Sequence, residues 1–204
     1  MTAEATQHLA RADKTIARLI KRVGPCTLKP KDGRSPFASL VQSVAYQQLN
    51  GTAAKTILDR VKALYPHRRF PTPEDLLTTP AERLRGAGLS RAKVAAIKDI
   101  AAKTVEGVVP GSRAITKMSD AEIVERLTTL RGVGPWTVEM LLIFTLGRTD
   151  VLPATDYGVR KGFAVTYGWK DLPTPKELLA YGERWRPHRT TAAWYLWRAL
   201  ELNA

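Results

Sequence analysis

The sequence has very little cysteine and histidine. Cys26 is its one cysteine, and the three histidines, His8, His67 and His188, are far apart in the chain. One thiol cannot build a disulfide framework, a four-cysteine iron–sulfur cluster or a thiolate zinc site within one chain. The histidines also lack the close spacing of metal ligands. Disulfide-stabilised and thiolate-metal proteins are therefore excluded.

Long apolar runs are missing as well. The N-terminal stretch Met-Thr-Ala-Glu-Ala-Thr-Gln-His lacks the apolar core of a signal peptide, and no run approaches the length that spans a membrane. We therefore expect a cytoplasmic protein that binds no membrane. It would associate with the nucleoid in a bacterium, or lie in the nucleus of a eukaryote.

Acidic residues are few relative to basic ones. The 204 residues include 32 Lys and Arg against 19 Asp and Glu, which gives a formal net charge of +13. An apolar share of 44% is too high for a disordered basic tail, so the charge belongs to a folded chain. Such a charge favours a polyanionic partner, and nucleic acid is the leading candidate.

Strand and hairpin signals are absent, whereas helix starts recur. A capping side chain precedes a proline at Ser35, Thr72 and Thr174, and Ser119 with Glu122 has the spacing of a capping box. Apolar residues follow these starts at intervals of three and four positions. We expect an all-α fold.

The pattern L-R-G-x-G occurs twice, at 84–88 and 130–134, and each copy joins two helical segments. Before the second copy a capped helix is expected to end at Leu130, and after it Pro135 opens a helix that ends near Gly147. Glycines allow positive φ and close approach, and the free N–H groups at the next helix start can bind a phosphate. A plain helix connection is the alternative.

The residues that flank the second glycine turn favour a phosphate-binding role over a plain helix connection. The stretch L-R-G-V-G-P-W-T at 130–137 resembles the helix–hairpin–helix motif of the DNA glycosylase superfamily named for that hairpin, a Gly/Pro-rich loop and an aspartate. Segments 47–54, 84–97 and 183–189 also look familial, and the last resembles the 3-methyladenine DNA glycosylase II (AlkA-like) branch. The resemblance covers about residues 36–200.

The resemblance implies an all-α, two-lobed glycosylase fold with the active-site cleft between the lobes. One lobe would comprise residues 36–150 and carry the hairpin at about 121–146. The other would comprise 1–35 and 151–204, with the catalytic loop and the C-terminal helix. The resemblance is to a short form of the family, for which no extra N-terminal domain is expected.

The resemblance also implies a catalytic residue. Asp156 matches the family's essential aspartate, whose carboxylate would stabilise the oxocarbenium character that develops at C1′. Asp156 also stands where a helix could begin, and an N-cap role is compatible with catalysis. Asp150 is the rival acid and is expected to be structural. Trp136 occupies the position where lyase relatives carry a lysine nucleophile, which implies a monofunctional enzyme.

Two further groups follow from the resemblance. Leu49, with Gln48 beside it, would fill the gap left by a flipped base, although an ordinary core leucine is the alternative. A pocket for cationic alkylated purines would use aromatic faces, with core packing as the alternative for the two tryptophans. Its candidates are Trp136, Trp197, Tyr46, Tyr157 and Met140, the last replacing an aromatic residue of some relatives.

DNA contacts are expected at the hairpin. Gly132 and Gly134 would offer main-chain N–H groups to phosphates, and Thr137 would offer its hydroxyl. Positive charge would come from Arg131, Arg160 and Lys161, with further charge around Arg91 and Lys93. No cofactor is expected, apart from a Na⁺ or K⁺ ion on the hairpin carbonyls of Thr128, Leu130 and Val133. The expected partner is double-stranded DNA that contains alkylated bases, bound by a monomer.

These features predict a base excision repair hydrolase of the DNA-3-methyladenine glycosylase II type. It would flip N3-methyladenine or a related N-alkylpurine out of the duplex and hydrolyse its N-glycosidic bond, with etheno and other N-alkylated bases as further candidates. Two alternatives stay open. One is a non-enzymatic module that only grips the DNA backbone, and the other is an enzyme that excises oxidised or mismatched bases and cleaves the strand.

Overall fold

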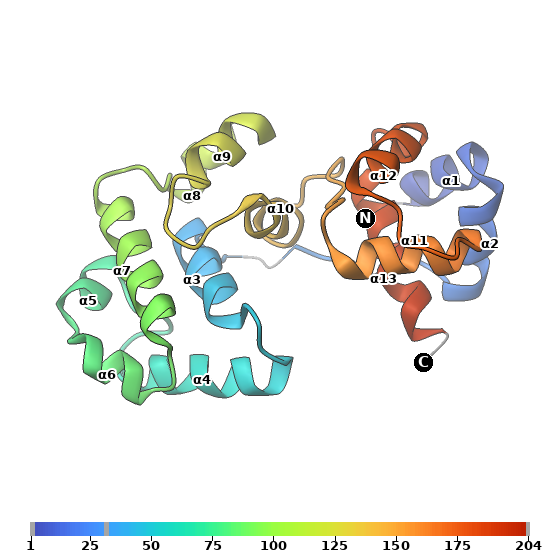
Figure 1. Ribbon diagram of the computed structural model, residues 1–204. Coiled ribbons are helices and arrows are strands. Elements are labelled where there is room, and N and C mark those ends of the chain that lie inside the picture. Colours follow the sequence, from blue (N-terminus) through green and yellow to red (C-terminus); the bar gives the residue numbers. More distant parts are fainter. Residues whose placement is uncertain (1–2, 31–32, 203–204) are drawn as a thin grey trace. The chain divides into compact units, whose positions relative to one another are not determined.

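The computed structural model describes residues 3–30 and 33–202. Every regular element in these residues is a helix, which confirms the all-α expectation (Figure 1). None of the helices in these two ranges is long and apolar enough to cross a membrane. The chain divides into two compact units, a terminal unit of Met1–Pro30 with Leu142–Ala204 and a central unit of Lys31–Leu141. The sequence predicted divisions after residues 35 and 150, whereas these units divide after Pro30 and Leu141.

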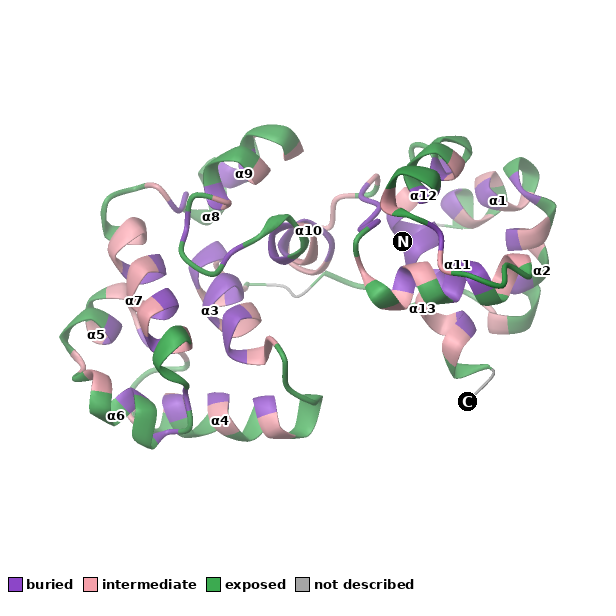
Figure 2. Cartoon of the chain, in the orientation of Figure 1, coloured by how far each residue is buried: buried purple, intermediate pink, exposed green. Residues whose placement is uncertain are grey.

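The central unit is built around one long helix. Its helices are α3 (Pro36–Tyr46), α4 (Gly51–Ala63), α5 (Pro73–Thr78), α6 (Ala81–Gly86), α7 (Arg91–Val105), α8 (Ser112–Ile115) and α9 (Asp120–Leu127). Helix α7 packs against α3, α5 and α6, and α3 also packs against α4. Figure 2 shows buried stretches on both α3 and α7. Leu40 and Val44 of α3 and Ile97 and Ile100 of α7 are buried.

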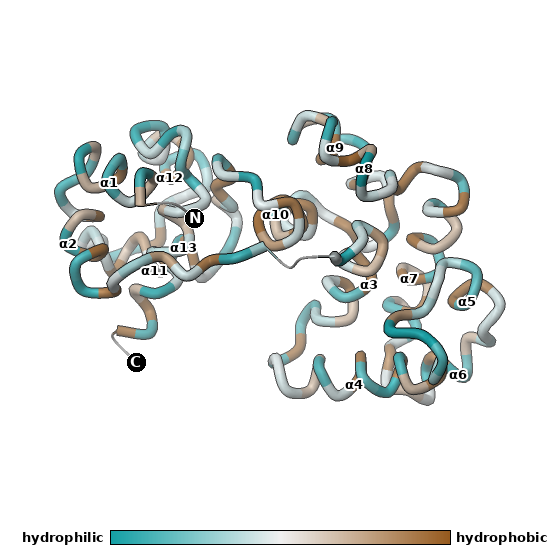
Figure 3. Tube along the Cα trace, turned by 180° about the vertical axis from the view of Figure 1, so that it is seen from behind, coloured by the Kyte–Doolittle hydropathy of each residue, from teal (hydrophilic) through white to brown (hydrophobic). Residues whose placement is uncertain are grey.

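Helix α10 (Pro135–Phe144) contains the division between the units, which falls after Leu141. Its sequence, PWTVEMLLIF, is hydrophobic along almost its whole length, as the brown trace of α10 in Figure 3 shows. Val138, Leu141, Leu142 and Ile143 are all buried. A helix that is apolar on all sides is stable only when most of its surface is covered.

The terminal unit brings both ends of the chain together. It contains α1 (Ala3–Ala12), α2 (Lys14–Val23), α11 (Tyr157–Tyr167), α12 (Pro175–Gly182), a short 3-10 helix η1 (Glu183–Trp185) and α13 (Arg189–Glu201). Helix α13 packs against α11 and α2, and α1 packs against α2 and η1. Phe163, Trp185 and Tyr195 are fully buried in this core.

A buried carboxylate lies in the same core. Asp13 is 6% exposed, caps α2 through the N–H groups of Thr15 and Ile16, and accepts hydrogen bonds from the Tyr167 hydroxyl at 2.7 Å and the Trp185 indole at 3.2 Å. Burial by itself raises the pKa of Asp13, but these donors outweigh it and hold the pKa below its ordinary value. Asp13 therefore joins α2, α11 and η1.

The helix starts predicted from the sequence are confirmed. Ser35, Thr72, Ser119 and Thr174 each accept a hydrogen bond from the first turn of the following helix, and Ser119 with Glu122 forms a complete capping box. The helix expected to end at Leu130 ends earlier, at Leu127. Hydroxyl groups cause the difference, because Thr128 and Thr129 donate back to carbonyls of the last turn and close it.

Candidate functional site

Asp156 begins α11 as its N-cap residue. Its Oδ1 atom accepts the Val159 N–H at 2.8 Å, and the indole Nε1 of Trp197 donates to the same oxygen, also at 2.8 Å. The side chain is half-buried, so the carboxylate is held from two directions without being fully enclosed. The N-cap geometry expected from the sequence is thus present, and it is combined with a contact to α13.

Glycine makes the contact between Asp156 and Trp197 possible. A Cβ atom at Gly158 would lie 2.9 Å from Trp197 Cδ1 and 3.1 Å from Asp156 Oδ1, and one at Gly162 would collide with the Leu196 carbonyl oxygen. These two glycines, one turn apart on α11, allow α13 to approach closely enough for the indole to reach the carboxylate. The sequence reasoning missed both, although glycines four residues apart within a helix are a readable signal.

Trp197 itself is half-buried between two partners. Its ring stacks on Phe144 with centroids 5.7 Å apart and an interplanar angle of 25°, while its N–H is directed to Asp156. Both contacts fix the orientation of the indole. In this arrangement Trp197 positions the carboxylate, whether or not its ring also lines a pocket.

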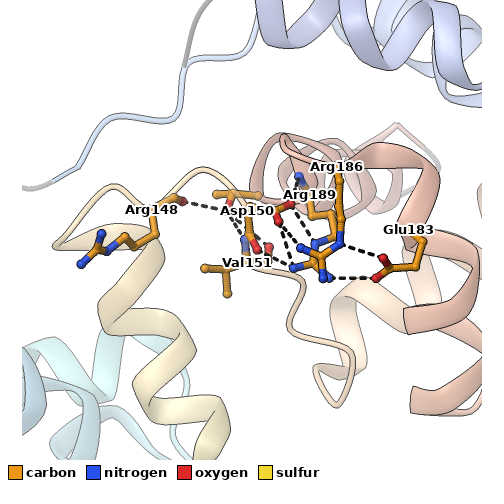
Figure 4. A network of polar contacts seen from close by, with 7 residues as sticks. Arg148, Asp150, Val151, Glu183, Arg186 and Arg189 are labelled. Atoms are coloured by element: carbon orange, nitrogen blue, oxygen red, sulfur yellow. Dashed lines mark hydrogen bonds and ion pairs between the residues drawn. The ribbon is translucent and has the colours of Figure 1, made fainter. Parts of the chain in front are cut away.

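The loop that leads to Asp156 is anchored at its other end by an ion-pair network (Figure 4). Asp150 accepts from Arg189 Nε at 2.8 Å and from Arg186 Nη1 at 2.6 Å, and Glu183 pairs with both arginines. Arg189 is the most buried of these charges, with 13% of its side chain exposed. Asp150 thus has a structural role in anchoring this loop, as expected.

The first turn of α13 adds a second anchor to this loop. The Thr190 hydroxyl accepts the Val151 N–H at 2.9 Å and donates to the Arg148 carbonyl at 2.8 Å, and the Thr190 N–H donates to the Thr149 carbonyl. Trp197 lies two turns further along the same helix. One helix therefore holds both ends of the loop 148–156. No local pattern in these residues predicts this, because the partners are far apart in the chain.

The glycine hairpin lies between α9 and α10. Gly132 has a φ of +74°, and a Cβ atom there would lie 3.1 Å from Ala96 Cβ, so both conformation and space require glycine. Val133, between the two glycines, is buried and anchors the turn in the core. Gly132 and Gly134 are both exposed. In the described residues, the main-chain hydrogen bonds that this turn donates run from the Arg131 N–H to Asp99 Oδ2, at 2.8 Å, and from the Val133 N–H to the Leu130 carbonyl.

A second exposed turn follows α3. Gln48 has a φ of 57°, which makes it the one non-glycine residue with positive φ in the described chain, and Leu49 next to it is 39% exposed. Leu49 is therefore not an ordinary core leucine. A left-handed non-glycine residue beside an exposed leucine marks a turn held in an unusual conformation.

The remaining predicted site residues are distributed over both units. Trp136 (38% exposed), Tyr46 and Met140 belong to the central unit, whereas Trp197 and the exposed Tyr157 belong to the terminal unit. The structure thus joins Asp156 to Trp197 by a direct contact. For Trp136, Tyr46, Met140 and Tyr157 a place in the substrate pocket stays a prediction.

Several predicted DNA contacts have internal partners. Thr137 is 2% exposed and its hydroxyl oxygen accepts from Gln47, which favours a role inside the hairpin over a phosphate contact. Arg160 Nε donates to the Pro173 carbonyl, and Lys93 Nζ donates to the Ala45 and Gln47 carbonyls at 2.8 Å each. Burial lowers the pKa of Lys93. Arg91, Arg131 and Lys161 are exposed, so they remain available to bind phosphates.

No cluster of three or more His, Cys, Asp or Glu side chains suited to a metal ion occurs in the part of the chain that the structure describes. The groups expected to hold a monovalent cation at the hairpin are main-chain carbonyls, not side chains. Thr128 is the C-cap of α9, and the Leu130 carbonyl accepts the Val133 N–H at 3.1 Å. Carbonyl oxygens at a helix C-terminus carry the negative end of the helix dipole and suit a hard cation.

An all-α chain with a glycine hairpin and a capping aspartate aligned by an indole has the architecture of a helical base excision repair protein. Residues 41–187 match the family model described as "HhH-GPD superfamily base excision DNA repair protein". This match covers most of the chain. The chain belongs to the HhH-GPD superfamily.

Individual relatives agree with this assignment. DNA-3-methyladenine glycosylase 1 of Schizosaccharomyces pombe is 39% identical over 202 residues, which are 98% of this chain and 88% of the relative. The structure of Schizosaccharomyces pombe 3-methyladenine DNA glycosylase (Mag1) in complex with abasic DNA matches with a TM-score of 0.88 over 96% of both chains. The DNA-3-methyladenine glycosidase of Bacillus halodurans matches with a TM-score of 0.84 at 34% identity, over 97% of this chain and 89% of the other.

Proposed function

We propose that this protein is a DNA glycosylase that removes N3-methyladenine and related N-alkylpurines from duplex DNA, with etheno and other N-alkylated bases as further substrates. The observation that carries the proposal is the Asp156 carboxylate, fixed by Trp197 and by the first turn of α11. Relatives named DNA-3-methyladenine glycosylase, at up to 39% identity over nearly the whole chain, favour this activity over a binding module without catalysis.

The chemistry follows from the residues. The damaged nucleotide leaves the stack, and Leu49 takes the space it vacates. The C1′–N bond then breaks, its electron pair leaves with the base, and the carboxylate of Asp156 stabilises the positive charge that develops at C1′. A water oxygen bonds to C1′ and its proton passes to Asp156. The products are the free base and an abasic site. N-alkylation already activates the leaving group, so little further acid catalysis is needed.

The reaction stops at base removal in this proposal. A strand-cleaving relative needs an amine nucleophile that forms a Schiff base with C1′, and Trp136 occupies the position of that lysine. Borohydride should therefore trap no covalent adduct between the protein and a duplex that contains a damaged base. A trapped adduct would show that the protein has a lyase step.

The test of the glycosylase function is direct. A panel of duplexes, each with one defined modified base, is incubated with the protein, and released base is measured by chromatography. Asp156→Asn should lower the rate by about 10²- to 10⁴-fold, the usual contribution of such a group, and leave duplex affinity within a few-fold. Asp59→Asn, at an exposed position on α4, is the matched control and should be fully active. No release from any alkylated purine would refute the substrate class.

We also propose how the substrate pocket selects its base. The faces of Trp136, Trp197, Tyr46 and Tyr157 would stack on a cationic purine, whose charge favours an electron-rich ring. Met140, a flexible side chain in place of an aromatic one, would admit larger adducts. Met140→Phe should then reduce release of etheno bases more than release of N3-methyladenine. Equal reductions would argue against a role of Met140 in selection.

The DNA contact is proposed to centre on the hairpin, where Gly132 and Gly134 would offer N–H groups to a phosphate. A Na⁺ or K⁺ ion on the carbonyls of Thr128, Leu130 and Val133 would neutralise the C-terminus of α9 near that phosphate. Duplex affinity measured in KCl and in tetramethylammonium chloride at equal ionic strength tests the ion, because tighter binding is expected in KCl. Equal affinity would argue against it.

The proposed assembly is a monomer on its DNA, in the cytoplasm or, in a eukaryote, the nucleus. Sedimentation of the free protein and of its complex with a short duplex should give masses for one protein chain in each. A complex with two chains per duplex would contradict this.

A further inference from the structure

We propose that Gln47 is a positioning residue that ties the turn carrying Leu49 to the glycine hairpin, so that the group that fills the stack and the group that grips the backbone move as one piece. The proposal rests on the function proposed above and names a residue that the sequence reasoning did not single out. It is built on contacts within the central unit alone.

The side chain of Gln47 reaches across the unit. Its Nε2 donates to the Gly132 carbonyl at 3.0 Å and to the Thr137 hydroxyl oxygen at 3.3 Å. Gly132 is the left-handed residue of the hairpin, and Thr137 lies in the first turn of α10. One amide group therefore contacts both the turn of the hairpin and the start of its second helix.

The main chain of Gln47 is fixed just as firmly. As the C-cap of α3 it donates its N–H to the Ser43 and Val44 carbonyls, at 3.1 and 3.3 Å. Its carbonyl accepts a hydrogen bond from Lys93 Nζ at 2.8 Å, and the same ammonium group also binds the Ala45 carbonyl. Gln47 is thus held to α3, α7 and the hairpin at once.

The next two residues show what this anchoring is for. Gln48, with its φ of 57°, is exposed and adopts a conformation that an unrestrained glutamine would rarely keep. Leu49 follows it and is exposed on the turn, where an apolar side chain gains nothing in water. A fixed Gln47 sets the direction in which the chain enters this turn. The position of Leu49 relative to Gly132 is then set by a network inside the protein before DNA binds.

A Gln47 that only stabilises the fold would make the same contacts. The test must therefore separate a role in folding from a role in positioning Leu49. The probe is a duplex with a tetrahydrofuran abasic site and a neighbouring 2-aminopurine, whose fluorescence rises when Leu49 enters the stack. This signal needs no catalysis. The variants are Gln47→Met, which keeps the length of the side chain and removes its donor, Leu49→Ala, and the double substitution. Gln42→Met, five residues earlier on α3, is the matched control.

Gln47→Met should lower the 2-aminopurine signal and the single-turnover rate of base release by about five- to thirtyfold, the change that loss of its two neutral hydrogen bonds, to Gly132 and Thr137, produces. Its affinity for undamaged duplex should stay within about twofold. In the Leu49→Ala background the same substitution should have little further effect, because Gln47 acts through Leu49. Gln42→Met should behave like wild type. Additive effects of the two substitutions, or a loss of affinity for undamaged DNA that accounts for the whole change, would overturn the proposal.

Two further arms keep the outcome clear. If Gln47→Met does not fold, Gln47→Glu keeps the shape and removes the donor, and the same non-additivity with Leu49→Ala is expected. If wild-type protein shows the 2-aminopurine signal but releases no alkylated base, the proposed substrate is wrong and the coupling still stands. If it releases base and the double-mutant cycle is additive, the coupling is wrong and the function stands.

Discussion

Replacing Trp197 by phenylalanine tests most directly whether the indole positions Asp156, the residue proposed for catalysis. The substitution removes the Nε1–H that donates to Asp156 Oδ1 at 2.8 Å and keeps an aromatic ring that can stack on Phe144. Asp156 retains its hydrogen bond from the Val159 N–H. The carboxylate therefore keeps its place at the start of α11, and it loses the contact that aligns it from α13.

The size of the effect follows from the type of bond that is lost. A hydrogen bond to a charged acceptor contributes about 1.5–3 kcal/mol, and the lower end applies because the Asp156 side chain is half exposed. A loss of about 1.4 kcal/mol in transition-state stabilisation lowers the rate about tenfold. The smaller ring should also cost roughly 1–2 kcal/mol in the free energy of unfolding.

The assay is single-turnover release of N3-methyladenine from a duplex, with enzyme in excess, beside a thermal denaturation of each variant. Trp169→Phe is the matched control, because Trp169 is 42% exposed in the same unit and should leave the rate unchanged. Binding to an undamaged duplex should be equal in all three proteins. A Trp197→Phe protein that releases base at the wild-type rate would show that the indole N–H does not position the acid.

Two predictions concern stability. Gly162→Ala should lower the free energy of unfolding by about 3 kcal/mol, because the added methyl collides with the Leu196 carbonyl. Gly168→Ala is strained only by its own φ of 70° and should cost less. Urea denaturation compares the two variants, and equal losses would contradict the close approach of α11 and α13. Asp13, whose pKa is lowered in the folded state, adds stability above its ordinary pKa, and this stability is lost as the pH falls through the lower, folded-state value. The urea midpoint should therefore fall less between about pH 5 and pH 3 in Asp13→Asn than in wild type. Asp171→Asn, at an exposed position, is the control and should follow wild type. Parallel falls in all three proteins would refute this role of Asp13.

Local signals predicted the elements of this fold well. Serine and threonine caps before Pro36, Pro73 and Pro175 stand where the helices begin, since a cap acts within one turn and is written in adjacent residues. Asp156 was placed at a helix start for the same reason. Helix ends were harder, because α9 stops at Leu127 through side-chain hydrogen bonds to its own carbonyls, which compete with regular helix in a way that periodicity does not show.

The contacts that organise the site were not predictable in the same way. Lys93 was assigned to the charged surface from its type, yet it binds carbonyls at the end of α3, 46 and 48 residues earlier in the chain. Thr137 was expected to face DNA, yet its hydroxyl faces Gln47. Each depends on a partner distant in sequence, and a residue's polarity says nothing about whether that partner is water, phosphate or another part of the chain.

The hold of α13 on both ends of the loop 148–156 has a consequence for the order in which the molecule becomes competent. Asp156 is aligned by Trp197, a residue 41 positions later, and the loop before it is anchored by Arg189 and Thr190. A growing chain on the ribosome can fold the hairpin and α11 while Asp156 still lacks these partners. Alignment of Asp156 then arrives with the docking of α13, so the group proposed for catalysis is completed last, after the parts proposed to hold DNA.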